Sequence, residues 1–192
     1  MFRPSLAFIV LAAASLAGCI PTLYPLYTAQ TMAFDPALVA EWVKDGSRES
    51  WVFNRAGEKE YRLVLTDGDG KQGQFSVRLV ELQGRRFLDI HPIEPALEAS
   101  GLYKALLLRA HTFLKVDQLG DSLKMSFVKP DWLKKRLQQR PGDVRHELID
   151  DRILLTAQPQ DLQAFVLSIV EEGAAWGEVG ELKKAPSAIL AF

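Results

Sequence analysis

The residues that could carry chemistry form two incomplete motifs. Residues 68–73, GDGKQG, match the G-x-G-x-x-G pattern of dinucleotide-binding loops. That pattern must follow a strand and open a helix, so that helical amides meet the pyrophosphate. Here a strand-like segment follows directly, which predicts a hairpin loop. The segment His146–Asp150 has a histidine and a glutamate but lacks the second histidine of a zinc-protease helix. The sequence therefore predicts neither a nucleotide site nor metalloprotease chemistry.

The chain offers few other groups for covalent or metal chemistry. It has three histidines, His91, His111 and His146, and one cysteine, Cys19. A single cysteine excludes an intramolecular disulfide and a zinc site built from paired cysteines. No G-x-S-x-G sequence supplies a serine nucleophile. We therefore expect a non-catalytic protein with no metal site and no dissociable cofactor.

Chain length and net charge further limit the class of protein. The 192 residues include 23 Lys+Arg and 24 Asp+Glu, and 48% are hydrophobic. That is enough chain for one domain with a sizeable core. Because there is no basic excess to neutralise phosphates, we expect no nucleic-acid partner.

The first residues are typical of a secretory signal. In residues 1–18, MFRPSLAFIVLAAASLAG, a single basic residue, Arg3, precedes an apolar run that small residues end. The run from Leu6 to Ala17 is shorter than the ~20 residues that a permanent membrane-spanning helix needs. A cleaved signal peptide is therefore the favoured interpretation, and a retained anchor or a buried helix is the alternative.

Leu16-Ala17-Gly18-Cys19 resembles the lipobox of bacterial lipoproteins. In that family cleavage falls just before the cysteine, whose thiol receives a diacylglyceryl group and whose new amino terminus receives an acyl chain. The resemblance implies that residues 1–18 are removed and that Cys19 is the lipid attachment site. It also makes membrane lipid a partner and the covalent diacylglycerol and N-acyl chain the only attached groups. An ordinary free or buried thiol is the alternative.

The resemblance also implies a location. Each buried methylene contributes about 0.8 kcal/mol, so three acyl chains on one residue anchor a protein almost permanently. Ile20 follows the cysteine, and in lipoproteins of double-membraned bacteria an aspartate there usually means retention at the inner membrane. We therefore expect a lipid-anchored protein of the bacterial cell envelope, in the outer membrane and facing the periplasm.

Alternating apolar residues predict the fold of the body. Short alternating runs separated by glycine-containing turns fill residues 42–90, and a second group covers residues 112–156. We count about eight or nine candidate strands, close to what a small closed barrel needs. At Leu79-Val80 the apolar residues change from odd-numbered to even-numbered positions, which predicts a bulge or a bend. The sequence predicts a mainly β fold with flanking helices, in which an antiparallel meander closes into a barrel.

Helices are expected at four places. Asp35-Pro36 is typical of a helix start, and segments 96–108 and 130–139 permit helices. In Pro159–Glu172 the apolar residues recur at helical spacing, which predicts an amphipathic helix packed on the outside of the barrel.

This arrangement resembles the lipocalin, or calycin, architecture. The lipocalin opening motif is Gly-x-Trp, and the matching stretch is Ala40-Glu41-Trp42, with the glycine absent. Segments around His111, Trp132-Leu133 and 153–157 also resemble a group of uncharacterised bacterial envelope lipoproteins. The predicted organisation is a signal peptide (1–18), a lipid-anchored tether (19–34), a lipocalin-like barrel domain (35–172) and a loose C-terminal tail (173–192).

Two groups of residues are candidates for binding. Five aromatic residues either line a ligand cavity in the barrel or fill it, and two histidines are candidate polar contacts there: Trp42, Trp51, Phe53, Phe75, Phe127, His91 and His111. A second group is basic and forms either a patch for a partner or for anionic headgroups, or a solvated helix face: Lys129, Lys134, Lys135, Arg136 and Arg140.

Two functions from different classes follow. In the first, the barrel is a binding module for a small apolar ligand such as a fatty acid or a lipid fragment. In the second, the barrel core is solid, and the protein is a structural or accessory lipoprotein that docks an envelope protein through the basic helix or the segment 96–108.

Overall fold

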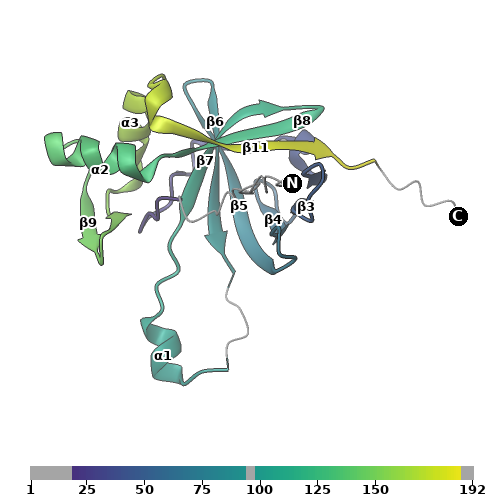
Figure 1. Cartoon of the computed structure of the whole chain (residues 1–192), viewed down its shortest axis with the longest axis horizontal. Helices are drawn as coiled ribbons and strands as arrows, with labels where there is room; N and C mark the ends of the chain where they lie inside the picture. Colours follow the sequence, from purple (N-terminus) through teal and green to yellow (C-terminus); the bar gives the residue numbers. More distant parts are fainter. Residues whose placement is uncertain (1–18, 94–97, 187–192) are drawn as a thin grey trace, which may run out of the picture.

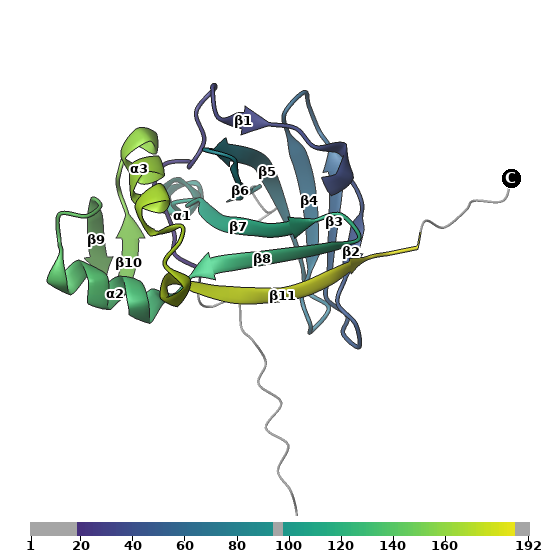
Figure 2. The same cartoon turned by 90° about the horizontal axis from the view of Figure 1, so that it is seen from above.

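The computed structural model describes residues 19–93 and 98–186. Within them, eight antiparallel strands close into a barrel (Figures 1 and 2). In the order in which they pair around the barrel, the strands are β5 (Gln72–Leu82), β4 (Tyr61–Thr66), β3 (Ser50–Arg55), β2 (Glu41–Val43), β11 (Trp176–Lys184), β8 (Ser122–Val128), β7 (Thr112–Leu119) and β6 (Arg85–Pro92). β6 pairs with β5 and completes the circle. The predicted mainly β barrel is confirmed.

The remaining elements lie outside the barrel. A short strand, β1 (Met32–Ala33), adds to β5, and a 3-10 turn, η2 (Pro36–Leu38), precedes β2. The helices α2 (Pro130–Gln139) and α3 (Pro159–Ile169) and the hairpin of β9 (His146–Ile149) and β10 (Arg152–Leu155) gather at one side of the barrel (Figure 2). The helix α1 (Gly101–Leu106) stands apart, and η3 (Gly173–Ala175) leads into β11.

Two separate apolar cores stabilise this arrangement. One fills the barrel and includes Trp42, Trp51, Phe53 and Tyr61. The other lies between the outer barrel wall, α2, α3 and the β9–β10 hairpin. The predicted apolar stripe of α3 is buried in this outer core, as expected of a helix packed outside: Leu162, Phe165, Val166 and Ile169. In this region, both the inner and the outer face of the barrel wall are therefore buried.

The second core explains the phase shift seen at Leu79-Val80. Of the predicted bulge or bend, the bulge is wrong, because β5 pairs with β6 in unbroken register from Phe75 to Leu82. Leu79 belongs to the barrel core and Val80 to the outer core. Both faces of β5 are buried at this point, so both faces carry apolar residues.

The C-terminal segment is the largest correction to the predicted organisation. Residues 173–192 were expected to be a loose tail, but β11 pairs with both β2 and β8 and closes the barrel. Residues 187–192 of that expected tail lie outside the described residues. The register of β11 shifts between Glu178 and Gly180, whose φ is +114°. The bulge places Trp176 in the outer core and Leu182 in the barrel core, so the alternation that marks a strand is lost.

Smaller corrections concern the other boundaries. Residues 19–34 were expected to be a tether, but they pack against the barrel, and Leu26 is completely buried. The expected helix at 96–108 is shorter: α1 begins at Gly101 and ends at Leu106, and residues 96 and 97 lie outside the described residues. So does the proposed signal peptide, residues 1–18. None of the helices in the described ranges combines the length and the apolar character needed to cross a membrane.

We expect Leu182→Ala to destabilise the protein by about 2–5 kcal/mol, the usual cost of truncating a buried leucine, because this side chain of β11 is 1% exposed. Glu178 on the same strand is exposed and supplies a matched control, whose replacement by alanine should change the free energy of unfolding by less than about 0.5 kcal/mol. Urea unfolding measures both. Equal stabilities of Leu182→Ala and the wild type would contradict the closing role of β11.

Candidate functional site

The barrel interior holds three of the predicted lining residues as packed core. Trp42, Trp51 and Phe53 are at most 1% exposed. The indole of Trp42 donates to the carbonyl oxygen of Leu38 at 3.1 Å, and that of Trp51 donates to a carboxylate oxygen of Glu49 at 3.2 Å. Their polar atoms are therefore satisfied within the chain, and these side chains fill the barrel.

The other two aromatic candidates lie at the margin of this core. Phe75 and Phe127 are partly buried against it. Gly73 and Gly177 leave room for their rings: a Cβ on Gly73 would come within 2.9 Å of Phe75, and one on Gly177 within 3.0 Å of Phe127. Both rings are thus fitted against neighbouring backbone.

Two cavities of the described residues lie on the outside of the barrel. The first, of about 300 Å³, lies beside the β5–β6 turn, β7 and the end of α3, and its lining includes Arg85, Arg86, Lys115, Asp117 and Glu171. The second, of about 400 Å³, lies between Pro21 and the β9–β10 hairpin. Neither is lined by any of the seven predicted residues. The first is too charged to suit an apolar ligand.

The two histidine candidates do not line the interior, which corrects the sequence prediction. His91 and Asp89 alternate along β6 with the inward-facing Leu88 and Ile90, so they belong to the outer face. The rings of His91 and His111 lie 4.3 Å apart between centroids. His111 Nδ1 lies 2.7 Å from Asp89 Oδ1. The histidines therefore belong to a polar cluster on the outer wall.

This cluster fixes the N-terminal segment, and sequence reasoning missed it. Asp89 is 1% exposed, and its Oδ2 accepts a hydrogen bond of 2.7 Å from the backbone N–H of Leu26. The backbones of Thr22 and His111 exchange two hydrogen bonds, of 2.8 and 2.9 Å. We call Thr22, Leu26, Asp89 and His111 the N-terminal clamp. The available signal was Asp89 itself, a carboxylate within the apolar run of β6.

Further contacts extend the clamp to the outer helices and the hairpin. The backbone N–H of Leu23 donates to the carbonyl oxygen of Leu155 at 2.7 Å. The side-chain amide of Gln163 on α3 donates to the carbonyl oxygen of Leu26, also at 2.7 Å. The segment that follows Cys19 is thus tied to three different parts of the fold.

Cys19 lies beside the first residue of β7. Its side chain is partly buried against the barrel core. Burial raises the pKa of its thiol, and a hydrogen bond with the Thr112 side chain opposes this shift. The hydroxyl of Thr112 donates to the carbonyl oxygen of Ile20 at 3.0 Å. The predicted lipid attachment site therefore lies at the end of the barrel where β7 begins.

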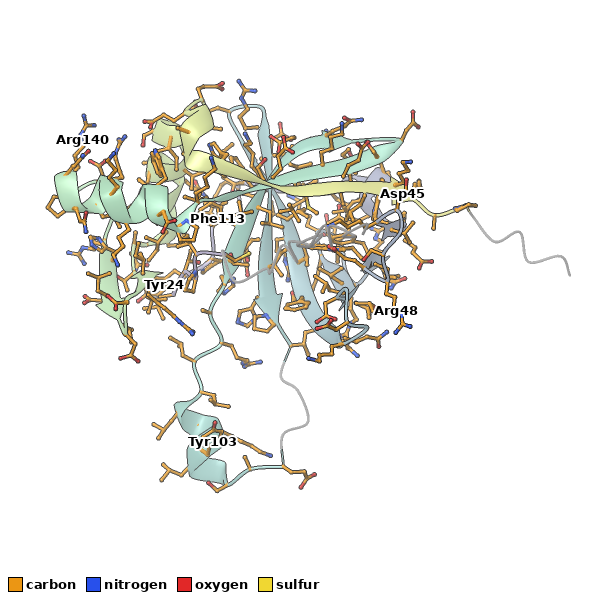
Figure 3. All side chains as sticks on the ribbon, in the orientation of Figure 1. Tyr24, Asp45, Arg48, Tyr103, Phe113 and Arg140 are labelled. Atoms are coloured by element: carbon orange, nitrogen blue, oxygen red, sulfur yellow. The ribbon has the colours of Figure 1, made fainter. Side chains whose placement is uncertain are left out.

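The basic candidates divide into a paired residue and an exposed set. Arg136 Nη1 lies 3.0 Å from Glu172 Oε1, and the Arg136 guanidinium also pairs with Asp143. Arg136 therefore joins α2 to its neighbours and is not part of an open patch, contrary to the prediction. Lys129, Lys134, Lys135 and Arg140 are exposed, and Arg140 lies at the outer end of α2 (Figure 3). Of these four, Lys134 also lies 3.8 Å from Asp151 Oδ1 on the β9–β10 turn.

The two incomplete motifs have structural roles. In the turn between β4 and β5, Asp67 Oδ1 accepts hydrogen bonds from the backbone N–H groups of Asp69 and Lys71, at 3.0 and 2.9 Å. This confirms the predicted hairpin loop. His146 lies on β9, and its Nδ1 is 2.9 Å from the carbonyl oxygen of Val144. The described residues contain no group of three or more His, Cys, Asp or Glu side chains placed to hold a metal ion.

Comparison with protein-family models, with curated proteins and with solved structures yields no match to this chain.

The histidine pair predicts a pH dependence. The pKa of His91 is lowered, because burial and the neighbouring His111 disfavour its protonated form. The folded protein then binds fewer protons at His91 than the unfolded chain does, so its stability is lost as pH falls below the ordinary histidine pKa of about 6.5. We expect the free energy of unfolding to fall between pH 7.5 and about 5.5, and to fall less in His91→Gln. Urea unfolding across this range measures the difference, and identical pH profiles would contradict it.

Proposed function

We propose that this chain is a lipid-anchored accessory protein of the bacterial cell envelope. Its solid, non-catalytic barrel would dock a protein partner rather than carry an apolar ligand. The observation that carries the proposal is the filled barrel interior, in which the largest side chains are Trp42, Trp51, Tyr61 and Phe53, each at most 1% exposed.

The filled interior separates the two functions that the sequence left open. Pockets for small molecules usually have volumes of roughly 300–1,000 Å³ with a mainly apolar lining. The barrel core instead consists of interdigitated aromatic and aliphatic side chains, and the cavity beside α3 is lined by charged residues. The packing supports a scaffold more strongly than it supports a carrier of fatty acids.

The exposed basic residues of α2 are the proposed docking surface. Leu133 and Leu137 are buried in the outer core, and Arg136 pairs with Asp143 and Glu172. These contacts hold the helix in place while Lys134, Lys135 and Arg140 remain exposed. Lys134 also lies 3.8 Å from the exposed Asp151, and Asp131 is exposed on the same helix, so the surface is mainly basic. A mainly basic surface favours an acidic partner and speeds its association, and we propose an acidic face of another envelope protein.

The anchor in this proposal is Cys19. The lipobox-like sequence Leu16-Ala17-Gly18-Cys19 supports acylation there, and Ile20 supports sorting to the outer membrane. The clamp supports the idea that the barrel is held at a defined position relative to the acyl chains, since it begins at Thr22, three residues after the attachment site.

A solid core predicts that xenon does not enter the barrel. In NMR spectra of the protein under xenon pressure, the methyl signals of the interior leucines should not shift. Leu63→Ala is the positive control, because Leu63 is completely buried and its truncation should leave an apolar cavity that admits xenon. Xenon-induced shifts in the wild type, or a lipid that remains bound noncovalently in native mass spectrometry, would favour the ligand-carrying function instead.

Charge reversal tests the docking surface. We expect Lys134→Glu, Lys135→Glu and Arg140→Glu together to lower the recovery of the partner at least about tenfold, because like charges now face each other. The reversal Arg48→Glu with Lys71→Glu is the control, and Arg48 lies on the other side of the molecule from Arg140 (Figure 3). Quantitative mass spectrometry of proteins co-purified from detergent-solubilised envelopes measures recovery. If the α2 variant recovers as much partner as the control variant does, α2 is not the docking surface.

A further inference from the structure

The helix α1 and the two residues after it expose an unusual amount of apolar surface. Five large apolar side chains are 44–75% exposed: Leu102, Tyr103, Leu106, Leu107 and Leu108. No residue of α1 is buried, and Figure 1 shows the helix well clear of the barrel. Single exposed apolar residues are ordinary, but a contiguous group usually marks an interaction surface. We call residues 101–108 the apolar arm.

The arrangement of apolar residues around α1 suits a lipid environment. Leu102 and Leu106 share one side of the helix, and Tyr103 lies about 100° around from Leu102. Leu107 and Leu108 continue the apolar surface beyond the helix end. These side chains therefore form one apolar face, and Lys104 lies on the opposite side of the helix. One apolar face opposite a basic polar face is typical of a segment that lies in the lipid–water interface.

The charges of the arm point to the same surroundings. Lys104 is the only charged residue of the arm, Arg109 follows the arm directly, and Glu98 lies three residues before it. Long basic side chains extend from an apolar segment to the headgroup layer, where they attract anionic lipids. The tyrosine suits the same layer, because its ring is apolar and its hydroxyl is polar.

The arm also begins and ends near the proposed anchor. The chain leaves the barrel after β6, which ends at Pro92, and returns at Thr112, the first residue of β7. The side chain of Thr112 contacts Cys19 and the backbone of Ile20. The clamp pairs Thr22 with His111, two residues after Arg109. The lipid attachment site and the apolar arm therefore emerge from the same end of the barrel.

We propose that the apolar arm inserts into the lipid–water interface of the membrane that carries the Cys19 acyl chains. This inference rests on the proposed function for the anchor, and it adds a second attachment point. Two attachments at one end of the barrel fix its orientation: the β7–β8 turn at Gly120-Asp121, at the other end of β7, faces away from the bilayer. The arm then contacts lipid, and the basic face of α2 is accessible to the protein partner.

Site-directed spin labelling measures this insertion directly. The chain has one cysteine, which acylation blocks, so Leu106→Cys supplies a single reactive thiol in the full chain expressed with normal processing. The labelled protein is reconstituted into vesicles of phosphatidylethanolamine and phosphatidylglycerol. Collisions of the nitroxide with oxygen, which concentrates in the bilayer, are compared with collisions with a water-soluble nickel complex. Asp121→Cys, at the exposed β7–β8 turn, is the matched control.

We expect the label at position 106 to collide several-fold more with oxygen than with nickel, and the label at 121 to show the reverse. Adding Leu102→Ser and Leu107→Ser should return the label at 106 to an aqueous environment. An aqueous label at 106 in protein that floats with the vesicles would overturn the insertion and leave the anchor intact. A label that stays at bilayer depth after both leucines are replaced would also contradict the role of the arm.

Failure of the anchor itself gives a different result. Intact-mass analysis would then find Cys19 without acyl chains, and the thiol would take up label. In that case the arm is tested by flotation of the unanchored chain with the same vesicles. Flotation that Leu102→Ser and Leu107→Ser abolish supports insertion by the arm alone, and a chain that stays in solution overturns it.

Discussion

The buried carboxylate of Asp89 fixes the position of the N-terminal segment, and with it that of the proposed lipid anchor, through its hydrogen bonds. One of its oxygens accepts from the backbone N–H of Leu26, and the other lies 2.7 Å from His111. A buried ionisable side chain is tolerated only when its hydrogen-bonding capacity is used. Here it attaches the segment after Cys19 to the barrel wall. Because this segment is fixed, the proposed lipid anchor has a defined position beside β7 and the apolar arm.

The inner and the outer core have different structural roles. The inner core makes the barrel rigid, and the outer core attaches α2, α3 and the β9–β10 hairpin to one side of it. Little of this apolar surface is left for a ligand. Two exposed features lie outside both cores: the basic residues Lys134, Lys135 and Arg140 at α2, and the leucines of the apolar arm. The proposals for docking and for membrane insertion both follow from this division.

Sequence patterns predicted the parts of the fold in which one face of an element is buried. Trp51 and Phe53 on β3 alternate with outward residues, and the stripe of α3 repeats at helical spacing, so both elements were found. The pattern failed where burial is two-sided or the register shifts. Val80 is buried by the outer core, and the bulge before Gly180 moves Leu182 to the opposite face from Trp176.

Candidate sites were predicted less well, for a related reason. The aromatic residues of the interior were identified from the sequence. Whether such residues line a cavity or fill it depends on side-chain volume and packing, and the spacing of residues along the sequence determines neither. The clamp joins Leu26 to Asp89 across 63 residues, so no local pattern marks it. His91 was assigned to the wrong face because Phe87 is buried outside the barrel while Leu88 is buried inside, which hides the alternation of β6.

Amide hydrogen exchange measures directly whether the clamp holds the N-terminal segment against the barrel. If the clamp holds, the backbone N–H groups of Thr22, Leu23 and Leu26, which donate to His111, Leu155 and Asp89, exchange as slowly as those of the neighbouring barrel strands. If residues 19–28 are a free tether, the same three amides exchange at the rate of an unstructured peptide. We expect slow exchange at all three amides, and exchange at the free-peptide rate would show that the barrel does not hold the segment.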